Sequence, residues 1–423
     1  MRSSAVALAF AGAVAAHVTG AEHSDHIKFC GLCTRFQFVF LRLQSSVSIP
    51  PREHWPRSPS EAPVPLRATP TPGTKSPING APDLPAATIN LANYPTFMSA
   101  PDVNSPEVKQ WVAEVAASGV QIPNIPRNVA APAGSGQSLC QINPEAALKA
   151  NAQGNCWWSC GSCTRDTDID TCPDKMTWGL TFDDGPSPYT PKVLNYLEEK
   201  KIAATFYVIG SNVIDKPAIL QATYLAGHEI ALHTWSHRAL TTLTNEEIIA
   251  ELGWNKKAIK DVIGVTPKGM RPPYGDIDDR VRAICKAMNL TPVMWTTEGE
   301  LQYDSNDWRV NDGSQTGPQL LATFNSLLDR ASQLNTGFVS LQHDFHNPPF
   351  ALQSVNECHK KPLSEAYIET STGSTTPSGG NSTSTSTGAA STPALREAPT
   401  IPALRPTPAE LSHETWSALS VPV

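Results

Sequence analysis

The sequence predicts an α/β fold within residues 174–360, a distorted or incomplete barrel of alternating strands and helices. Short runs of β-forming residues alternate there with helical patterns. Strands joined through helices pair in parallel by right-handed crossovers, which is how such a barrel is built. The segment is shorter than the roughly 250 residues of a complete eight-unit barrel, so an incomplete ring is expected. A doubly wound open sheet is the alternative arrangement.

The first elements of this region are marked by apolar runs with clear ends. Residues 176–182 are mostly apolar and stop at an Asp-Asp-Gly turn, which predicts a strand. A helix is expected over 191–201, because it opens with a proline and apolar residues follow at helical spacing. Two further strands are predicted over 204–210 and 229–233.

A long helix over 244–264 carries the strongest local signals. Thr244 and Glu247 have the spacing of a capping box, with Leu243 and Ile248 placed as its hydrophobic staple. Its apolar residues recur on one face. The remaining predicted elements are strands over 268–270, 290–295 and 337–342, and helices over 278–288 and 317–334.

The N-terminal segments differ from this region in composition. Residues 1–21 combine a positive Arg2, a run of small apolar residues and a polar end, the pattern of a cleaved secretory signal. Residues 22–88 are largely rich in proline and serine and predict an extended linker, although residues 24–45 contain an aromatic run with no assigned partner. Residues 89–173 form an extension with cysteines and one expected helix over 105–118.

Composition also limits the function. Residues 361–423 are rich in Ser, Thr and Pro and predict a disordered tail. No apolar run of 18 or more residues follows the N-terminus, so no transmembrane segment is expected. The net charge of −7 and the lack of a Lys/Arg cluster argue against a nucleic-acid partner. Nothing in the sequence sets the oligomeric state.

The chain has nine cysteines, five of them between residues 140 and 172. This spacing fits either a zinc knuckle or disulfides. Behind a secretory signal, an oxidising compartment favours disulfides. The odd count leaves at least one thiol unpaired.

Two pairs of polar residues end predicted strands, where α/β barrels build their active sites. Asp183 and Asp184 end the first strand, and two adjacent carboxylates are costly to ionise together unless a cation is near. His233 and His237 follow the third strand at a spacing that places both on one face of a helical turn, so they can share one metal. The alternatives are a plain turn and two surface histidines.

Three later segments complete the set. Residues 271–275, Arg-Pro-Pro-Tyr-Gly, follow the fourth strand, and the two prolines stiffen the backbone that carries an arginine able to pair with a carboxylate. Residues 304–308 follow the fifth strand, and residues 341–344 end the last one. A structural turn, a solvated loop and a structural histidine are the respective alternatives.

Together these five segments resemble the five motifs of carbohydrate esterase family 4, the NodB-like polysaccharide deacetylases, and most of all the fungal chitin deacetylases. The resemblance covers about residues 174–360 and is specific because the segments occur in the family order. It implies a metal-dependent amidohydrolase that releases acetate from N-acetylglucosamine units of chitin. The first 173 residues are not explained by it.

The resemblance also implies a role for individual residues. Asp183 would be the base, and Asp184, His233 and His237 would hold a divalent metal, zinc or cobalt in this family. Arg271 would orient the base. The remaining roles fall to residues of the later segments: the Tyr274 backbone N–H would stabilise an oxyanion, His343 would be the acid, Asp307 would hold it, and Trp308 and Leu341 would wall an acetyl pocket.

The resemblance and local motifs also predict covalent features. Cys172 resembles a cysteine of fungal members, and a Cys172–Cys358 disulfide would join the segments before the first strand and after the last. Asn289 and Asn381 begin N-glycosylation sequons.

Substrate and location leave alternatives open. Acetylated xylan or peptidoglycan would use the same chemistry, and a non-catalytic wall-binding protein is a weaker alternative. Secretion to the medium or cell wall is expected. A lipid (GPI-type) anchor is favoured by the Ser/Thr-rich stretch over 370–392, but residues 393–423 lack the apolar tail that such an anchor signal needs.

Overall fold

The computed structural model describes residues 63–345, except residues 77, 79, 87, 133, 153, 300, 311 and 312, together with the backbone of residues 356 and 357. These residues belong to one compact unit. The predicted signal, the segment 24–45 with its aromatic run, the tail over 361–423 and Asn381 lie outside the described residues.

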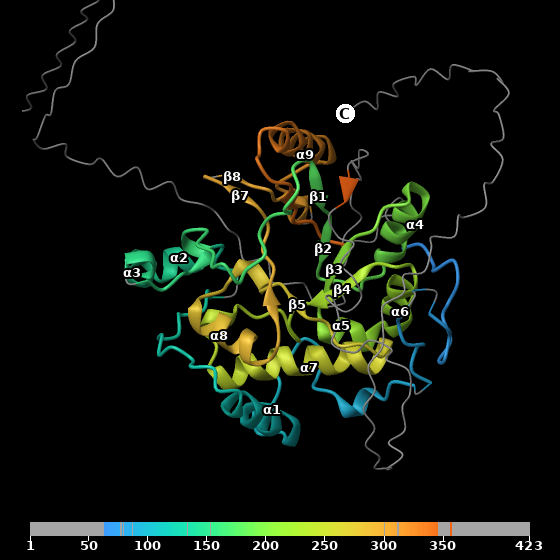
Figure 1. Cartoon of the computed structure of the whole chain (residues 1–423), viewed down its shortest axis with the longest axis horizontal. Coiled ribbons are helices and arrows are strands. Elements are labelled where there is room, and N and C mark those ends of the chain that lie inside the picture. The colour runs from blue at the N-terminus through green and yellow to red at the C-terminus, as the bar shows by residue number, and fades with distance from the viewer. Residues whose placement is uncertain are drawn as a thin grey trace, which may run out of the picture. The chain divides into compact units, whose positions relative to one another are not determined.

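A five-stranded parallel sheet in the order β2-β3-β4-β5-β6 forms the centre of the fold (Figure 1). Every neighbouring pair in it is parallel, as the alternation of strands and helices predicts. A three-stranded parallel sheet in the order β10-β1-β9 adjoins it in sequence, because β1 and β2 are separated only by Leu180. The strands are β1 Thr177–Gly179, β2 Thr181–Asp183, β3 Thr205–Val208, β4 Glu229–Leu232, β5 Gly269–Met270, β6 Thr291–Pro292, β9 Phe338–Val339 and β10 Asn356–Glu357.

Contacts outside the regular strands connect the two ends of the sheet and nearly close the barrel. The Thr296 N–H donates to the Val339 carbonyl at 3.0 Å, which links the chain after β6 to β9. Isolated bridges then join Asp304 to Leu341 and Asp183 to His343. The strands therefore form a nearly closed ring with incomplete ladders, which confirms the distorted barrel rather than the open sheet.

Helices cover this ring, and those that the sequence predicts match within three residues at each end. They are α4 Thr190–Lys200, α5 Gly210–Asp215, α6 Pro217–Leu225, α7 Asn245–Ile263, α8 Asp279–Ala287 and α9 Gly317–Ala331. Helices α5 and α6 were not predicted, because α5 is short and the apolar residues of α6 spread around the helix without a clear period. An antiparallel hairpin of β7 (Thr297–Glu298) and β8 (Leu301–Gln302) was also missed.

Helix α7 shows how local sequence sets an element. The Glu247 N–H donates to Thr244 Oγ1 at 3.1 Å, and the Thr244 N–H donates to Glu247 Oε2 at 2.8 Å, so the predicted capping box is present. The helix ends at Gly264, whose φ of 82° is the left-handed conformation that glycine adopts without strain.

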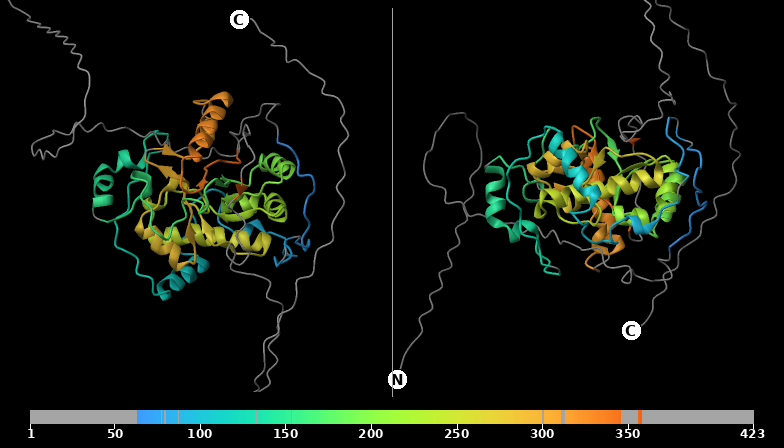
Figure 2. Two further views of the ribbon diagram at one scale, coloured as in Figure 1. Left: turned by 45° about the horizontal axis from the view of Figure 1, so that its top comes forward. Right: turned by 90° about the horizontal axis from the view of Figure 1, so that it is seen from below.

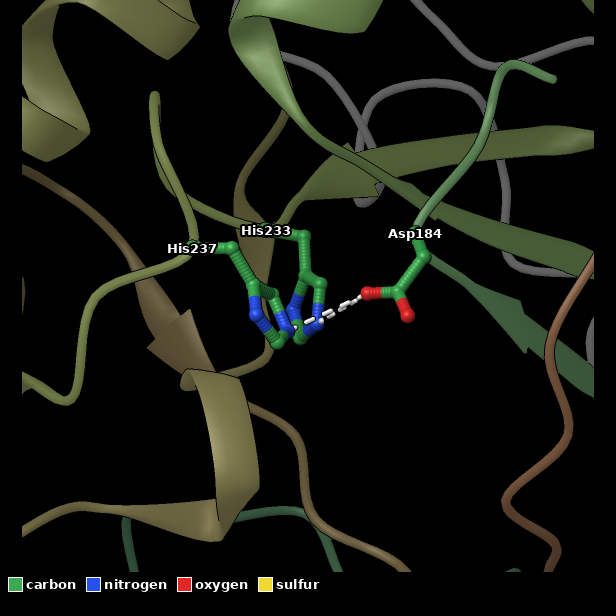
Figure 3. A group of neighbouring side chains, drawn as sticks. All are labelled: Asp184, His233 and His237. Atoms are coloured by element: carbon green, nitrogen blue, oxygen red, sulfur yellow. Dashed lines mark ion pairs between the residues drawn. The ribbon is translucent and has the colours of Figure 1, made fainter. Parts of the chain in front are cut away.

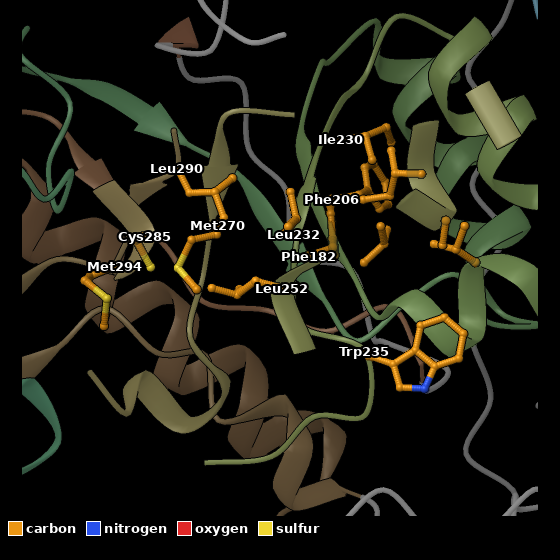
Figure 4. Packing of buried hydrophobic residues seen from close by; sticks show 14 of the residues in the cluster. Phe182, Phe206, Ile230, Leu232, Trp235, Leu252, Met270, Cys285, Leu290 and Met294 are labelled. Carbon is orange, nitrogen blue, oxygen red and sulfur yellow. The ribbon is translucent and has the colours of Figure 1, made fainter. Parts of the chain in front are cut away.

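The core lies between the sheet and these helices, as Figure 4 shows for part of it. Phe182 and Phe206, on adjacent strands, stack with ring centroids 5.3 Å apart. Leu252 of α7 and Met270 of β5 are fully buried in the same cluster. Cys285 is a free, buried thiol there, and it is the only free cysteine among the described residues.

The N-terminal extension packs on this core. Its predicted helix, α1 Pro106–Ala117, is capped by Ser105 and runs along α7 (Figures 1 and 2). Trp111 of α1 contacts Trp254 of α7 edge to face, with centroids 5.4 Å apart. Leu84, from the expected linker, is also buried in the core. Two further helices, α2 Leu139–Ile142 and α3 Pro144–Ala152, complete the extension.

The cysteine cluster forms disulfides, as the sequence predicts. Cys140 bonds Cys160, and Cys156 bonds Cys163. Cys172 is also disulfide-bonded, while its predicted partner Cys358 lies outside the described residues. Within the described part of the chain, no helix combines the length and apolar character needed to cross a bilayer.

Candidate active site

The predicted site residues gather at one end of the barrel, where strands β2, β4, β5 and β9 end. Asp184, His233 and His237 point toward one another there (Figure 3). Asp184 Oδ1 lies 3.3 Å from His233 Nε2 and 3.1 Å from His237 Nε2. All three side chains are at most 8% exposed, so three potential metal-ligand atoms surround one buried position.

The donor set suits a divalent cation. His233 Nδ1 lies 2.8 Å from the Arg271 carbonyl, which only accepts, so Nδ1 carries the proton and Nε2 keeps a free lone pair. Burial lowers the pKa of His237, which keeps that imidazole neutral at pH 7. Asp184 Oδ1 is buried without a hydrogen-bond partner. Two imidazole nitrogens and one carboxylate oxygen are ligands that zinc and similar ions accept.

The histidine pair is held differently from the helical turn that its spacing predicted. Strand β4 ends at Leu232, and the next residues form a loop in which Thr234 and His237 have φ values of 64° and 58°. The His237 N–H donates to Thr234 Oγ1 at 3.0 Å and helps to hold this shape. The helical turn was therefore wrong: left-handed residues, not helix periodicity, bring the two rings together.

Asp183 is paired with a buried arginine. Arg271 Nη1 donates to Asp183 Oδ1 at 2.8 Å and to Thr181 Oγ1 at 2.6 Å, and Arg271 is fully buried. Its guanidinium also lies 4.1 Å from the centroid of the Tyr207 ring. These contacts fix one oxygen of Asp183 and leave the other, Oδ2, 3.8 Å from His233 Nε2.

His343 is paired with Asp307 beside the cation site. His343 Nδ1 lies 2.7 Å from Asp307 Oδ1, and the His343 backbone N–H donates to Asp307 Oδ2 at 2.7 Å. Burial by itself lowers the pKa of His343, but the charge and hydrogen bond of Asp307, with the charges of Asp184 and Asp183, raise it to about 10. The imidazole is thereby held in its charged form, with Nε2 4.0 Å from Asp184 Oδ2.

A cavity of about 90 Å³ joins these groups. The predicted site residues that line it are Asp183, Asp184, His233, His237, Tyr274, Trp308, Leu341 and His343. Sequence reasoning did not select three further lining residues, Trp295, Asp304 and Phe345. Trp295 ends a predicted strand, Asp304 begins the segment 304–308, and Phe345 directly follows the segment 341–344. Their positions at strand ends are the signal that could have found them.

A buried set of two imidazoles and a carboxylate beside further acidic and basic side chains is typical of metal-dependent hydrolases, and comparison with known proteins agrees. Residues 170–293 match the family model described as polysaccharide deacetylase. A chitin deacetylase 1 from Cryptococcus neoformans var. grubii is 46% identical over 341 residues, which are 75% of this chain and 70% of that protein. The chain belongs to the polysaccharide deacetylase family.

Other relatives are matched over shorter stretches. A chitin deacetylase from Amylomyces rouxii is 40% identical over 200 residues, covering 45% of this chain and 46% of that protein. The solved chitin deacetylase of Colletotrichum lindemuthianum is 26% identical, with a TM-score of 0.39, over 43% of this chain and 78% of that one. The chain thus spans less than half the length of some of the relatives it matches.

Proposed function

We propose that the protein is a secreted chitin deacetylase that hydrolyses the N-acetyl groups of N-acetylglucosamine units, releasing acetate and leaving glucosamine. The observation that supports this most is the pairing of Asp183 with Arg271 and of His343 with Asp307 next to one three-ligand cation site. A protein that only binds polysaccharide needs neither a base nor an acid. The names of the fungal relatives favour chitin over xylan or peptidoglycan.

Asp184, His233 and His237 would hold the metal, which we propose is zinc or cobalt. When bound, such an ion polarises the acetyl carbonyl and lowers the pKa of a water molecule. The chain supplies everything else: the base, the acid, the oxyanion donor and the pocket.

Asp183 takes the proton from the attacking water, because its carboxylate lies beside the three-donor set with Oδ2 facing it. Arg271 fixes the position of that carboxylate through Oδ1. The water oxygen forms a bond to the carbonyl carbon, and negative charge develops on the carbonyl oxygen. The backbone N–H of Tyr274 donates to that oxygen.

His343 then gives its proton to the nitrogen as the C–N bond breaks, since an amine leaves poorly without one. Asp307 keeps His343 charged and correctly turned. The cavity, with Trp308 and Leu341 in its lining, accepts the acetyl methyl.

The test is acetate release from chitin oligomers, measured with and without chelator and after adding back zinc or cobalt. Release that disappears with chelator and returns with metal supports the proposal. Faster release from acetylated xylan or peptidoglycan would change the substrate, and no release from any of the three would support a binding protein.

Extracellular location is part of the proposal. The disulfides Cys140–Cys160 and Cys156–Cys163 fit an oxidising compartment. Asn289 is exposed and so accessible to a glycan. Location at the cell wall rather than in the medium would follow from a lipid anchor, and release of the protein from membranes by phospholipase tests that anchor.

A further inference from the structure

The cysteine-rich segment, residues 140–163, lies outside the family model, which begins at residue 170, and the five motifs give it no role. Its centre is Trp157, Trp158 and Ser159. Cys156, on one side of these residues, bonds Cys163, and Cys160, on the other, bonds Cys140. Both tryptophans are only 1% exposed, so two disulfides fix a short stretch with unusually large buried side chains.

These three residues pack on the turn that carries Tyr274. The Trp157 indole N–H donates to Asp276 Oδ1 at 2.9 Å. Ser159 Oγ donates to the Gly275 carbonyl at 3.2 Å and lies 3.2 Å from Asp276 Oδ1. The Trp158 N–H donates to the Ile277 carbonyl at 3.0 Å. The turn is thus contacted from Gly275 to Ile277, immediately after Tyr274.

The turn needs such support, because its conformation is one that most residues avoid. Tyr274 has a φ of 60°, in the left-handed region that residues with a Cβ rarely adopt. Gly275 follows with a φ of 64°, and a Cβ there would overlap the Trp158 ring. The ring in turn contacts Trp295 of the cavity lining, with centroids 4.3 Å apart.

Asp276 also connects this turn to the loop that carries His237. It is fully buried and accepts from the Thr241 N–H at 2.8 Å as well as from Trp157. Thr241 lies four residues after His237. Tyr274 Oη lies 3.1 Å from His237 Nδ1, so the turn touches the ligand loop directly.

We infer that the cysteine-rich segment positions the Tyr274 turn, with Trp157, Trp158 and Ser159 as positioning residues for the backbone N–H that faces the reacting carbonyl. This rests on the proposed function of that N–H. The segment itself does not line the cavity that takes the acetyl group. It acts by holding Gly275 and Asp276, and through them the direction of the preceding peptide.

The consequence is a specific kinetic signature. A donor that contacts the developing oxyanion affects the transition state more than the bound substrate. Its misplacement by a fraction of an ångström is expected to lower kcat by roughly tenfold to a hundredfold. KM should stay near the wild-type value, because the donor acts mainly in the transition state. Metal affinity should change less than kcat, because the His237 N–H keeps its separate bond to Thr234 Oγ1.

The test compares Trp157→Phe and Ser159→Ala with the matched control Trp178→Phe in the full-length secreted protein. Trp178 is also buried and also donates one indole hydrogen bond, to Ser340 Oγ at 2.8 Å, but it packs against Phe324 and Phe338 rather than the turn. Steady-state kinetics on chitin oligomers, calorimetric zinc titration of the metal-free protein and thermal unfolding are measured for all three.

Hydrogen exchange of the peptide spanning residues 271–278 provides a readout that needs no substrate. The Gly275 and Asp276 amides bond the Pro272 and Pro273 carbonyls at 3.0 and 2.9 Å and report on the turn. We expect faster exchange and lower kcat in Trp157→Phe and Ser159→Ala, with neither change in Trp178→Phe. Equal kcat and equal exchange in all three variants would overturn the inference. A wild type that releases no acetate, beside faster exchange in the two variants, would instead reject the proposed function.

Discussion

Replacing the two adjacent aspartates one at a time tests the proposed mechanism most sharply. In Asp183→Asn the shape of the side chain is kept, but the group can no longer take a proton. General base catalysis contributes roughly 10²–10⁴ in rate, so kcat should fall by that order. This corresponds to about 3–5 kcal/mol of transition-state stabilisation.

The structure also indicates how much unfolding free energy Asp183→Asn should lose. Breaking a buried ion pair by removing one partner costs about 3–5 kcal/mol. Arg271 keeps its bonds to Thr181 Oγ1 at 2.6 Å and to the Val293 carbonyl at 3.1 Å, and the asparagine oxygen still accepts from Nη1. The loss of unfolding free energy should therefore fall below that range, and Asp183→Asn should keep its metal.

Asp184→Asn is expected to fail in the opposite way. Asp184 supplies the anionic donor of the three-donor set, so its loss should weaken metal binding, and excess metal should restore part of the activity. Mass spectrometry of bound metal, beside acetate release, separates the two cases. If Asp183→Asn loses its metal while Asp184→Asn keeps it, the assignment is reversed. If neither loses activity, the site is misplaced.

The remaining predictions concern the acid, its charge and the covalent features. His343→Ala should resemble Asp183→Asn in keeping its metal, and the double variant should lose less than the product of the two single losses, because both serve one proton path. The acid acts only while protonated, so activity should be lost as pH rises through the raised pKa of His343. Asp307→Asn lowers that pKa and should therefore shift the alkaline limb of the pH–rate profile to lower pH. An unmoved limb would show that Asp307 does not control this proton. Non-reducing peptide mapping should find Cys172 joined to Cys358, and any other partner rejects that pair. Protein recovered from the medium or wall should lack about the first 20 residues, and an intact Met1 would contradict the secretory signal.

Local sequence determined much of this protein. The capping box of Thr244 and Glu247 and the terminal Gly264 fixed helix α7, since these signals act within a few residues. Polar residues at strand ends placed Asp183, Asp184 and His233 at one end of the barrel, because parallel strands in a barrel end on the same side. The order of the five motifs then identified the family.

Tertiary structure decided what depends on long-range packing. Cysteine spacing does not set disulfide pairing, so the bonds Cys140–Cys160 and Cys156–Cys163 required the folded chain. The left-handed loop that carries His237 has no periodic signal. The contact of Trp157 with Asp276 joins residues 119 positions apart. Sequence patterns report the local preferences of the backbone, whereas such contacts depend on which distant segments the collapse of the core brings together.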